Sequence, residues 1–124
     1  MLYDESGKCL QTNKLSSFES LSETQKGEVF NHIRSLIQGA LSYSPDFCIS
    51  RVCGGKFSNW AHTPLDYIYQ YHKNRNVLSP ENEAGKDVGR LFKYVMVNDK
   101  YRNYQMISDT NDYHPVNHYK LYEK

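Results

Sequence analysis

The clearest structural pattern in the chain lies in residues 79–97, SPENEAGKDVGRLFKYVMV. The stretch opens with a helix-start signal: a serine, then a proline at the first helical position and an acid in the first turn. Its apolar residues follow at the spacing of one buried helical face; they are Ala84, Val88, Leu91, Phe92, Val95 and Met96. A strand would have to bury Leu91–Val97 on both faces, which Lys93 opposes. The sequence therefore predicts a core helix that ends near Val97.

Two half-buried strands are expected after this helix. Apolar and polar residues alternate around Tyr104 and Met106, and again around Tyr119 and Leu121. Such alternation is typical of a strand with one face on the core. The residues between them, Asp109-Thr110-Asn111-Asp112, favour a turn. We therefore predict a C-terminal β-hairpin with a long tip.

Two more helices are expected before residue 79. The first should begin at the capping box Ser22-Glu23-Thr24-Gln25 and stop by Ser42–Tyr43, because Ser44-Pro45 disfavours helical geometry. The second should begin at Thr63-Pro64, with Thr63 as its N-cap, and end at Asn74–Asn76. Their inner faces are predicted to comprise Val29, Phe30, Ile33, Leu36, Ile37, Ala40 and Leu41 in the first, and Leu65, Ile68, Tyr69 and His72 in the second.

The remaining segments carry weaker signals. A second box, Ser16-Ser17-Phe18-Glu19, marks another possible helix start. Residues 47–49 and Val52 could form a short strand. We expect residues 1–22 to form an N-terminal arm or small hairpin around a turn at residues 4–7, and residues 23–124 to form the main domain.

The composition indicates one globular α+β domain of 124 residues with no leader and no membrane span. Three cysteines without an export signal favour a reduced, cytoplasmic protein. The net charge of +1 gives no overall attraction to nucleic acid, but residues 51–124 carry eleven basic and eight acidic side chains. Any nucleic-acid contact should therefore lie in the second half.

The order of helix, short strand, two helices and a hairpin resembles the winged helix-turn-helix superfamily from Glu23 to Tyr122. The resemblance implies a three-helix winged-helix-like domain whose third helix enters the DNA major groove while the hairpin wing touches the backbone. One departure is the link Asn74–Leu78, which is longer than the tight turn of a typical helix-turn-helix.

The polar face of the third helix is the candidate binding site. On a helical wheel, one amide and three cations fall within a sector of roughly 80° opposite the apolar stripe; they are Asn82, Lys86, Arg90 and Lys93. Gly85 and Gly89 flank this sector and leave backbone uncovered. Lys100 and Arg102, at the base of the wing, are the expected phosphate contacts. The same face could instead be solvated or contact a protein, and the acids at 109 and 112 on the wing favour a protein.

Two groups of residues have side-chain types that occur in metal or catalytic sites. Cys48, Cys53, His114 and His118 have the ligand types of a zinc site, but their spacing is not that of a zinc finger, so we expect neither metal nor cofactor. Cys53, His62 and Asp66 could form a nucleophilic group, yet nothing in their spacing requires it. We therefore expect a protein that is not an enzyme.

Two functions from different classes remain open. One is a DNA-binding regulator, for example of a phage or mobile element, with duplex DNA as its partner. The other is an inhibitor or adaptor of phage type that binds a protein complex of host defence, which the eleven tyrosines and the low net charge permit. A homodimer is also compatible with the sequence, through the first helix or the Gly85–Gly89 face.

Overall fold

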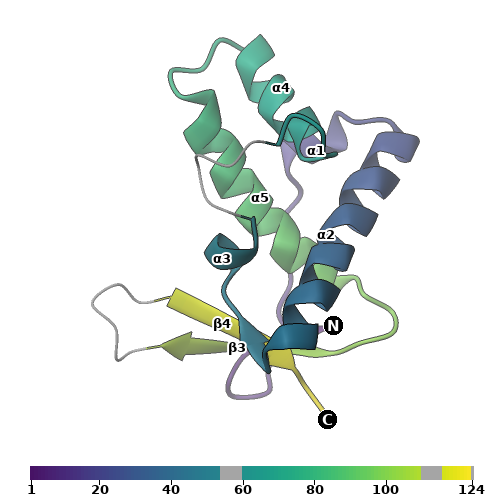
Figure 1. The fold of residues 1–124 in the computed structure, drawn as a ribbon, viewed down its shortest axis with the longest axis vertical. Helices are drawn as coiled ribbons and strands as arrows, with labels where there is room; N and C mark the ends of the chain where they lie inside the picture. Colours follow the sequence, from purple (N-terminus) through teal and green to yellow (C-terminus); the bar gives the residue numbers. More distant parts are fainter. Residues whose placement is uncertain (54–59, 110–115, 124) are drawn as a thin grey trace.

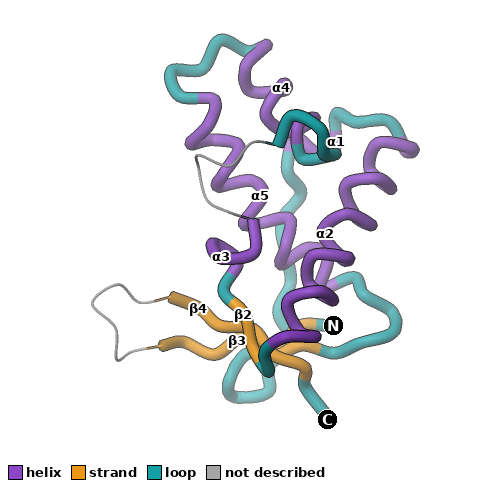
Figure 2. Tube along the Cα trace, viewed as in Figure 1, coloured by secondary structure: helices purple, strands orange, loops and turns teal. Residues whose placement is uncertain are grey.

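The computed structural model describes residues 1–53, 60–109 and 116–123. In these residues the chain forms five helices and a four-stranded mixed sheet (Figure 1), which confirms the expected α+β class. Figure 2 shows the helices gathered on one side of the sheet. The elements are β1 (Leu2–Tyr3), α1 (Ser16–Glu19), α2 (Glu23–Tyr43), β2 (Asp46–Phe47), α3 (Ile49–Cys53), α4 (Asp66–Asn74), α5 (Pro80–Val97), β3 (Tyr104–Asp109) and β4 (Val116–Leu121).

The predicted C-terminal hairpin is confirmed by the antiparallel pairing of β3 with β4. Tyr104 lies opposite Leu121 at its base, while residues 110–115 at the tip lie outside the described part of the chain. Tyr104 and Tyr119 point into the core, as their alternation predicts, but Leu121 is 47% exposed at the end of its strand. The hairpin forms the centre of the sheet, because β1 pairs parallel to β3 and β2 pairs antiparallel to β4.

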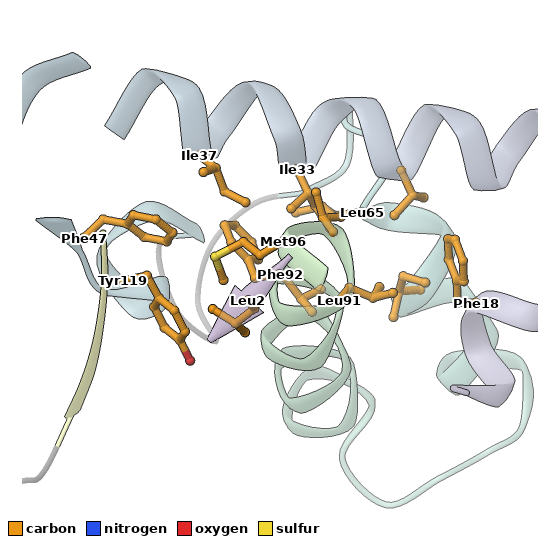
Figure 3. Packing of buried hydrophobic residues seen from close by; sticks show 14 of the residues in the cluster. Leu2, Phe18, Ile33, Ile37, Phe47, Leu65, Leu91, Phe92, Met96 and Tyr119 are labelled. Atoms are coloured by element: carbon orange, nitrogen blue, oxygen red, sulfur yellow. The ribbon is translucent and has the colours of Figure 1, made fainter. Parts of the chain in front are cut away.

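Helix α5 is the centre of the core, as residues 79–97 predict. All six apolar residues of its expected inner face are buried, and the helix ends at Val97. Figure 3 shows Phe92 and Met96 pointing towards Ile33 and Ile37 of α2, with Leu2 and Tyr119 of the sheet close by. The apolar periodicity therefore identifies the surface on which the other elements pack.

Helix α2 begins and ends where the sequence predicts. The Ser22 side chain accepts a hydrogen bond from the Gln25 N–H, and the Gln25 side chain accepts one from the Ser22 N–H, which makes a full capping box. At the other end Ser44 has extended geometry, as expected of a residue that precedes proline.

The expected start of α4 at Thr63 is wrong, because the helix begins at Asp66 with Leu65 as its N-cap residue. The Thr63 hydroxyl does not cap a helix but donates to the Trp60 carbonyl oxygen at 2.9 Å. The N–H of Asp66 bonds back to the carbonyl of Thr63, so the chain passes through a tighter turn first. The predicted inner residues Leu65, Ile68 and His72 are nevertheless buried.

The strand expected over residues 47–49 and Val52 is only partly correct. Its extended part is β2, and Ile49 and Val52 belong to the short helix α3. The Cys48 carbonyl accepts from the N–H groups of Arg51 and Val52, which turns the chain into a helix. The expected capping box at residues 16–19 is also absent, because Leu15 occupies the N-cap position of α1.

The N-terminal residues form a closed turn that packs on the main domain. Tyr3 bridges to Cys9, and the Asp4 carboxylate accepts hydrogen bonds from the N–H groups of Ser6 and Lys8. Gly7 stands at φ +86°, a conformation that favours glycine. Leu2 of β1 and Phe18 of α1 are part of the same core as α5, so residues 1–22 share the core of residues 23–124.

Among the described helices, none combines the length and the apolar character needed to cross a membrane.

Candidate nucleic-acid interface

The outward face of α5 carries the cations that the sequence singled out. Lys86 and Arg90 are exposed and Lys93 is half-buried. Lys86 lies 3.6 Å from the Glu83 carboxylate, and Arg90 lies 3.1 Å from that of Asp87. These two cations are thus partly neutralised, whereas Lys93 forms no ion pair with any residue that the structure describes. The exposed Lys86–Glu83 pair contributes little and exchanges readily, whereas the Arg90–Asp87 pair involves a buried carboxylate.

The first groove beside this face lies between α5, α3 and β4 and has a volume of about 360 Å³. The three cations of α5 line one side of it, and Ser50 and Asn117 add a hydroxyl and an amide on the other. We call this the β4 groove; its lining is Ile49, Ser50, Lys86, Gly89, Arg90, Lys93, Asn117 and Tyr119. Its polar groups are hydrogen-bond donors suited to an anionic ligand.

A second groove of about 360 Å³ lies between α5 and the segment that precedes α1. Its lining is Thr12, Asn13, Lys14, Leu15, Arg90 and Lys93, and we call it the N-terminal groove. Arg90 and Lys93 line both grooves and therefore stand between them. Lys14 is a residue that sequence reasoning missed, because no local pattern relates it to residues 90 and 93.

The two glycines of α5 leave its backbone uncovered, as expected. A Cβ atom added at either Gly85 or Gly89 would lie more than 4 Å from every described segment outside its own stretch of α5. Only Gly89 lines a groove, so the two positions differ in what they face.

The structure does not bring the remaining predicted site residues to the grooves. Lys100 and Arg102 are exposed in the loop between α5 and β3 and line neither groove. That loop is held by Asp99, whose carboxylate accepts from the N–H groups of Tyr101 and Arg102. Asn82 is exposed near the start of α5 and also lies outside both linings.

A buried polar network of Ser17, His72 and Asp87, which we call the Asp87 network, lies directly behind Arg90. One Asp87 carboxylate oxygen is 2.7 Å from the Ser17 hydroxyl and 2.7 Å from His72 Nε2, and the other accepts from Arg90. The three residues Ser17, His72 and Asp87 come from α1, α4 and α5, and all are buried. The serine hydroxyl donates to the carboxylate rather than to the imidazole, so this is not a nucleophilic triad. The network instead fixes Arg90 relative to three helices.

Two of the four residues with zinc-ligand side chains, Cys48 and His118, lie close together. Cys48 Sγ lies 3.5 Å from His118 Nδ1 and 3.6 Å from Nε2. A structural zinc site takes four ligands of this kind. Within residues 1–53, 60–109 and 116–123 no group of three metal-binding side chains occurs. The side chain of Cys53 and all of His114 lie outside the described part, and so does part of the Cys53, His62 and Asp66 arrangement.

Comparisons of this chain with protein-family models, with curated proteins and with solved structures returned no match.

Proposed function

We propose that this protein is a winged-helix-like DNA-binding protein that contacts duplex DNA through the outward face of α5. The observation that carries the proposal is the position of Arg90 and Lys93 between two polar grooves, with Lys86 and Lys14 beside them. Four cations in one region form a local basic surface on a chain whose net charge is only +1. A local cluster of this kind is what binding to phosphates requires.

The strand order supports the winged-helix part of the proposal. β2, which lies between α2 and α4 in the chain, pairs with β4 of the hairpin, so the hairpin and the helical part share one sheet. The third long helix, α5, presents its polar face beside β4, as a recognition helix beside a wing does. β1, α1 and α3 are additions to the pattern of three helices and a hairpin.

The test is a charge reversal that leaves the Asp87 network intact. We expect Lys86→Glu combined with Lys93→Glu to abolish binding to a mixed-sequence duplex, as measured by fluorescence anisotropy. For the wild type, four phosphate contacts predict an affinity that falls about 100-fold between 50 and 200 mM salt. Lys8→Glu combined with Lys73→Glu, two exposed lysines outside the grooves, is the matched control and should bind nearly as the wild type does. Unchanged affinity of the first variant would refute the proposal.

The second candidate function is binding to a protein complex. It is favoured by the mixed charge of the α5 face, where Glu83 and Asp87 already pair with two of the cations. Two results together would establish this candidate instead. The wild type would bind no DNA at 50 mM salt, and it would form a stable complex with a protein partner that Lys86→Glu with Lys93→Glu does not form.

A further inference from the structure

Residues 12–15 form one wall of the N-terminal groove, although they lie far from α5 in the sequence. This wall offers the Thr12 hydroxyl, the Asn13 amide and the Lys14 ammonium group. Hydroxyl, amide and ammonium donors are the groups that proteins use to contact phosphate oxygens. Arg90 and Lys93 complete the groove from the side of α5.

The backbone of the wall is held at both ends, so the segment that carries its donors is in place before any ligand binds. The N–H of Leu10 donates to the Leu2 carbonyl at 2.7 Å, and the Leu15 carbonyl accepts from the N–H groups of Phe18 and Glu19. Leu10 and Leu15 also pack against the core. A preorganised site loses less conformational entropy when it binds a ligand than a mobile arm does.

The Asp87 network ties this wall to the cations opposite it. Ser17, two residues after Leu15, donates to one Asp87 oxygen, while Arg90 donates to the other. One buried carboxylate therefore sets the distance between α1 and the Arg90 side chain. The N-terminal groove is built by buried contacts as well as by surface side chains.

We infer that the N-terminal groove is a second phosphate-binding site, which holds a DNA backbone on the side of Arg90 and Lys93 away from β4. An α-helix with its side chains is about 10–12 Å across, and the major groove of B-DNA is about 12 Å wide, so a helix that enters it has a backbone on each flank. The β4 groove takes one backbone and the N-terminal groove takes the other. This inference rests on the proposed function.

Two matched pairs of variants test the site. Lys14→Gln removes a cation from the groove, and Lys8→Gln removes an exposed cation from the same N-terminal region outside the lining. Asn13→Asp adds a negative charge inside the groove, and Gln11→Glu adds one just outside it. Each variant is titrated with the same duplex at several salt concentrations, and thermal unfolding shows that it is folded.

We expect Lys14→Gln to weaken binding about tenfold at 50 mM salt and to reduce the salt slope by about 0.9, the value of one phosphate contact. Asn13→Asp should weaken binding at least as much, while Lys8→Gln and Gln11→Glu should stay within about twofold of the wild type. Equal effects within both pairs would overturn the second site and leave the proposed function standing, provided that Lys86→Glu with Lys93→Glu still abolishes binding. A wild type that binds no duplex would overturn both.

Discussion

Asp87 shows how one residue of a helix can serve the core and the surface together. It lies within the buried face of α5, yet it accepts hydrogen bonds from Ser17 and Arg90 and contacts His72 at hydrogen-bond distance. His72 Nδ1 is also buried, and no residue of the described part provides a partner for it. The side chain of Asp87 therefore satisfies groups from two other helices that would otherwise be buried without partners.

We expect Asp87→Ala to lower the free energy of unfolding by about 2–4 kcal/mol, because it leaves the Ser17 hydroxyl and a His72 N–H buried and unpaired. Glu83→Ala removes a half-exposed acid from the same helix and should change the free energy of unfolding by less than about 0.5 kcal/mol. Urea unfolding measures both. Similar small losses in the two variants would show that Asp87 does not hold the helices together.

At the scale of elements, the loop from α5 to β3 is organised by one carboxylate. Burial alone would raise the pKa of Asp99. The hydrogen bond from the Tyr104 hydroxyl, those from the N–H groups of Tyr101 and Arg102, and the charge of Arg34 outweigh burial and hold this pKa below its ordinary value. Burial, followed by the hydrogen bond to Asp99, raises the pKa of Tyr104. The charged carboxylate and the neutral phenol therefore stabilise each other.

A carboxyl group whose pKa is lower in the folded state stabilises the fold at pH values above its unfolded-state pKa, which is about 3.9 for aspartate. This stabilisation is lost as the pH falls through the lower pKa of the folded state. We expect Asp99→Asn to be less stable than the wild type at pH 6, and the difference to shrink below about pH 4. Urea unfolding at pH 6, 4 and 2.5 measures this, with exposed Glu123→Gln as the control. A difference that does not vary with pH would exclude titration of Asp99 as its cause.

For the whole molecule, the N-terminus is part of the sheet and of the core. β1 pairs with β3, so Leu2 lies beside Tyr104 and is 1% exposed. We expect Leu2→Ala to lower the free energy of unfolding by about 2–5 kcal/mol, because it removes buried methyl groups and leaves a cavity. Leu78→Ala makes the same change at a fully exposed site and should stay within about 0.5 kcal/mol of the wild type. Equal losses would mean that β1 does not hold the core.

Features of this protein that depend only on neighbouring residues follow from the sequence alone. The capping box at Ser22, the proline at position 45 and the apolar periodicity of residues 84–96 act within a few residues, so α2, α5 and the C-terminal hairpin could be predicted. The cations Lys86, Arg90 and Lys93 were found in the same way, because helical periodicity places them on one face. The start of α4 could not be predicted in this way, since the Thr63 hydroxyl bonds to a carbonyl rather than capping the helix.

Contacts between distant segments are visible only in the folded chain. The pairing of Leu2 with Tyr104, the contact of Ser17 with Asp87 and the wall that Lys14 adds opposite Arg90 join segments about 70 to 100 residues apart. Their free energies come from packing and hydrogen bonds formed when the whole chain folds, and no local pattern records them. The tertiary structure also places Lys100 and Arg102 outside the grooves, because the Asp99 loop holds them apart from the face of α5.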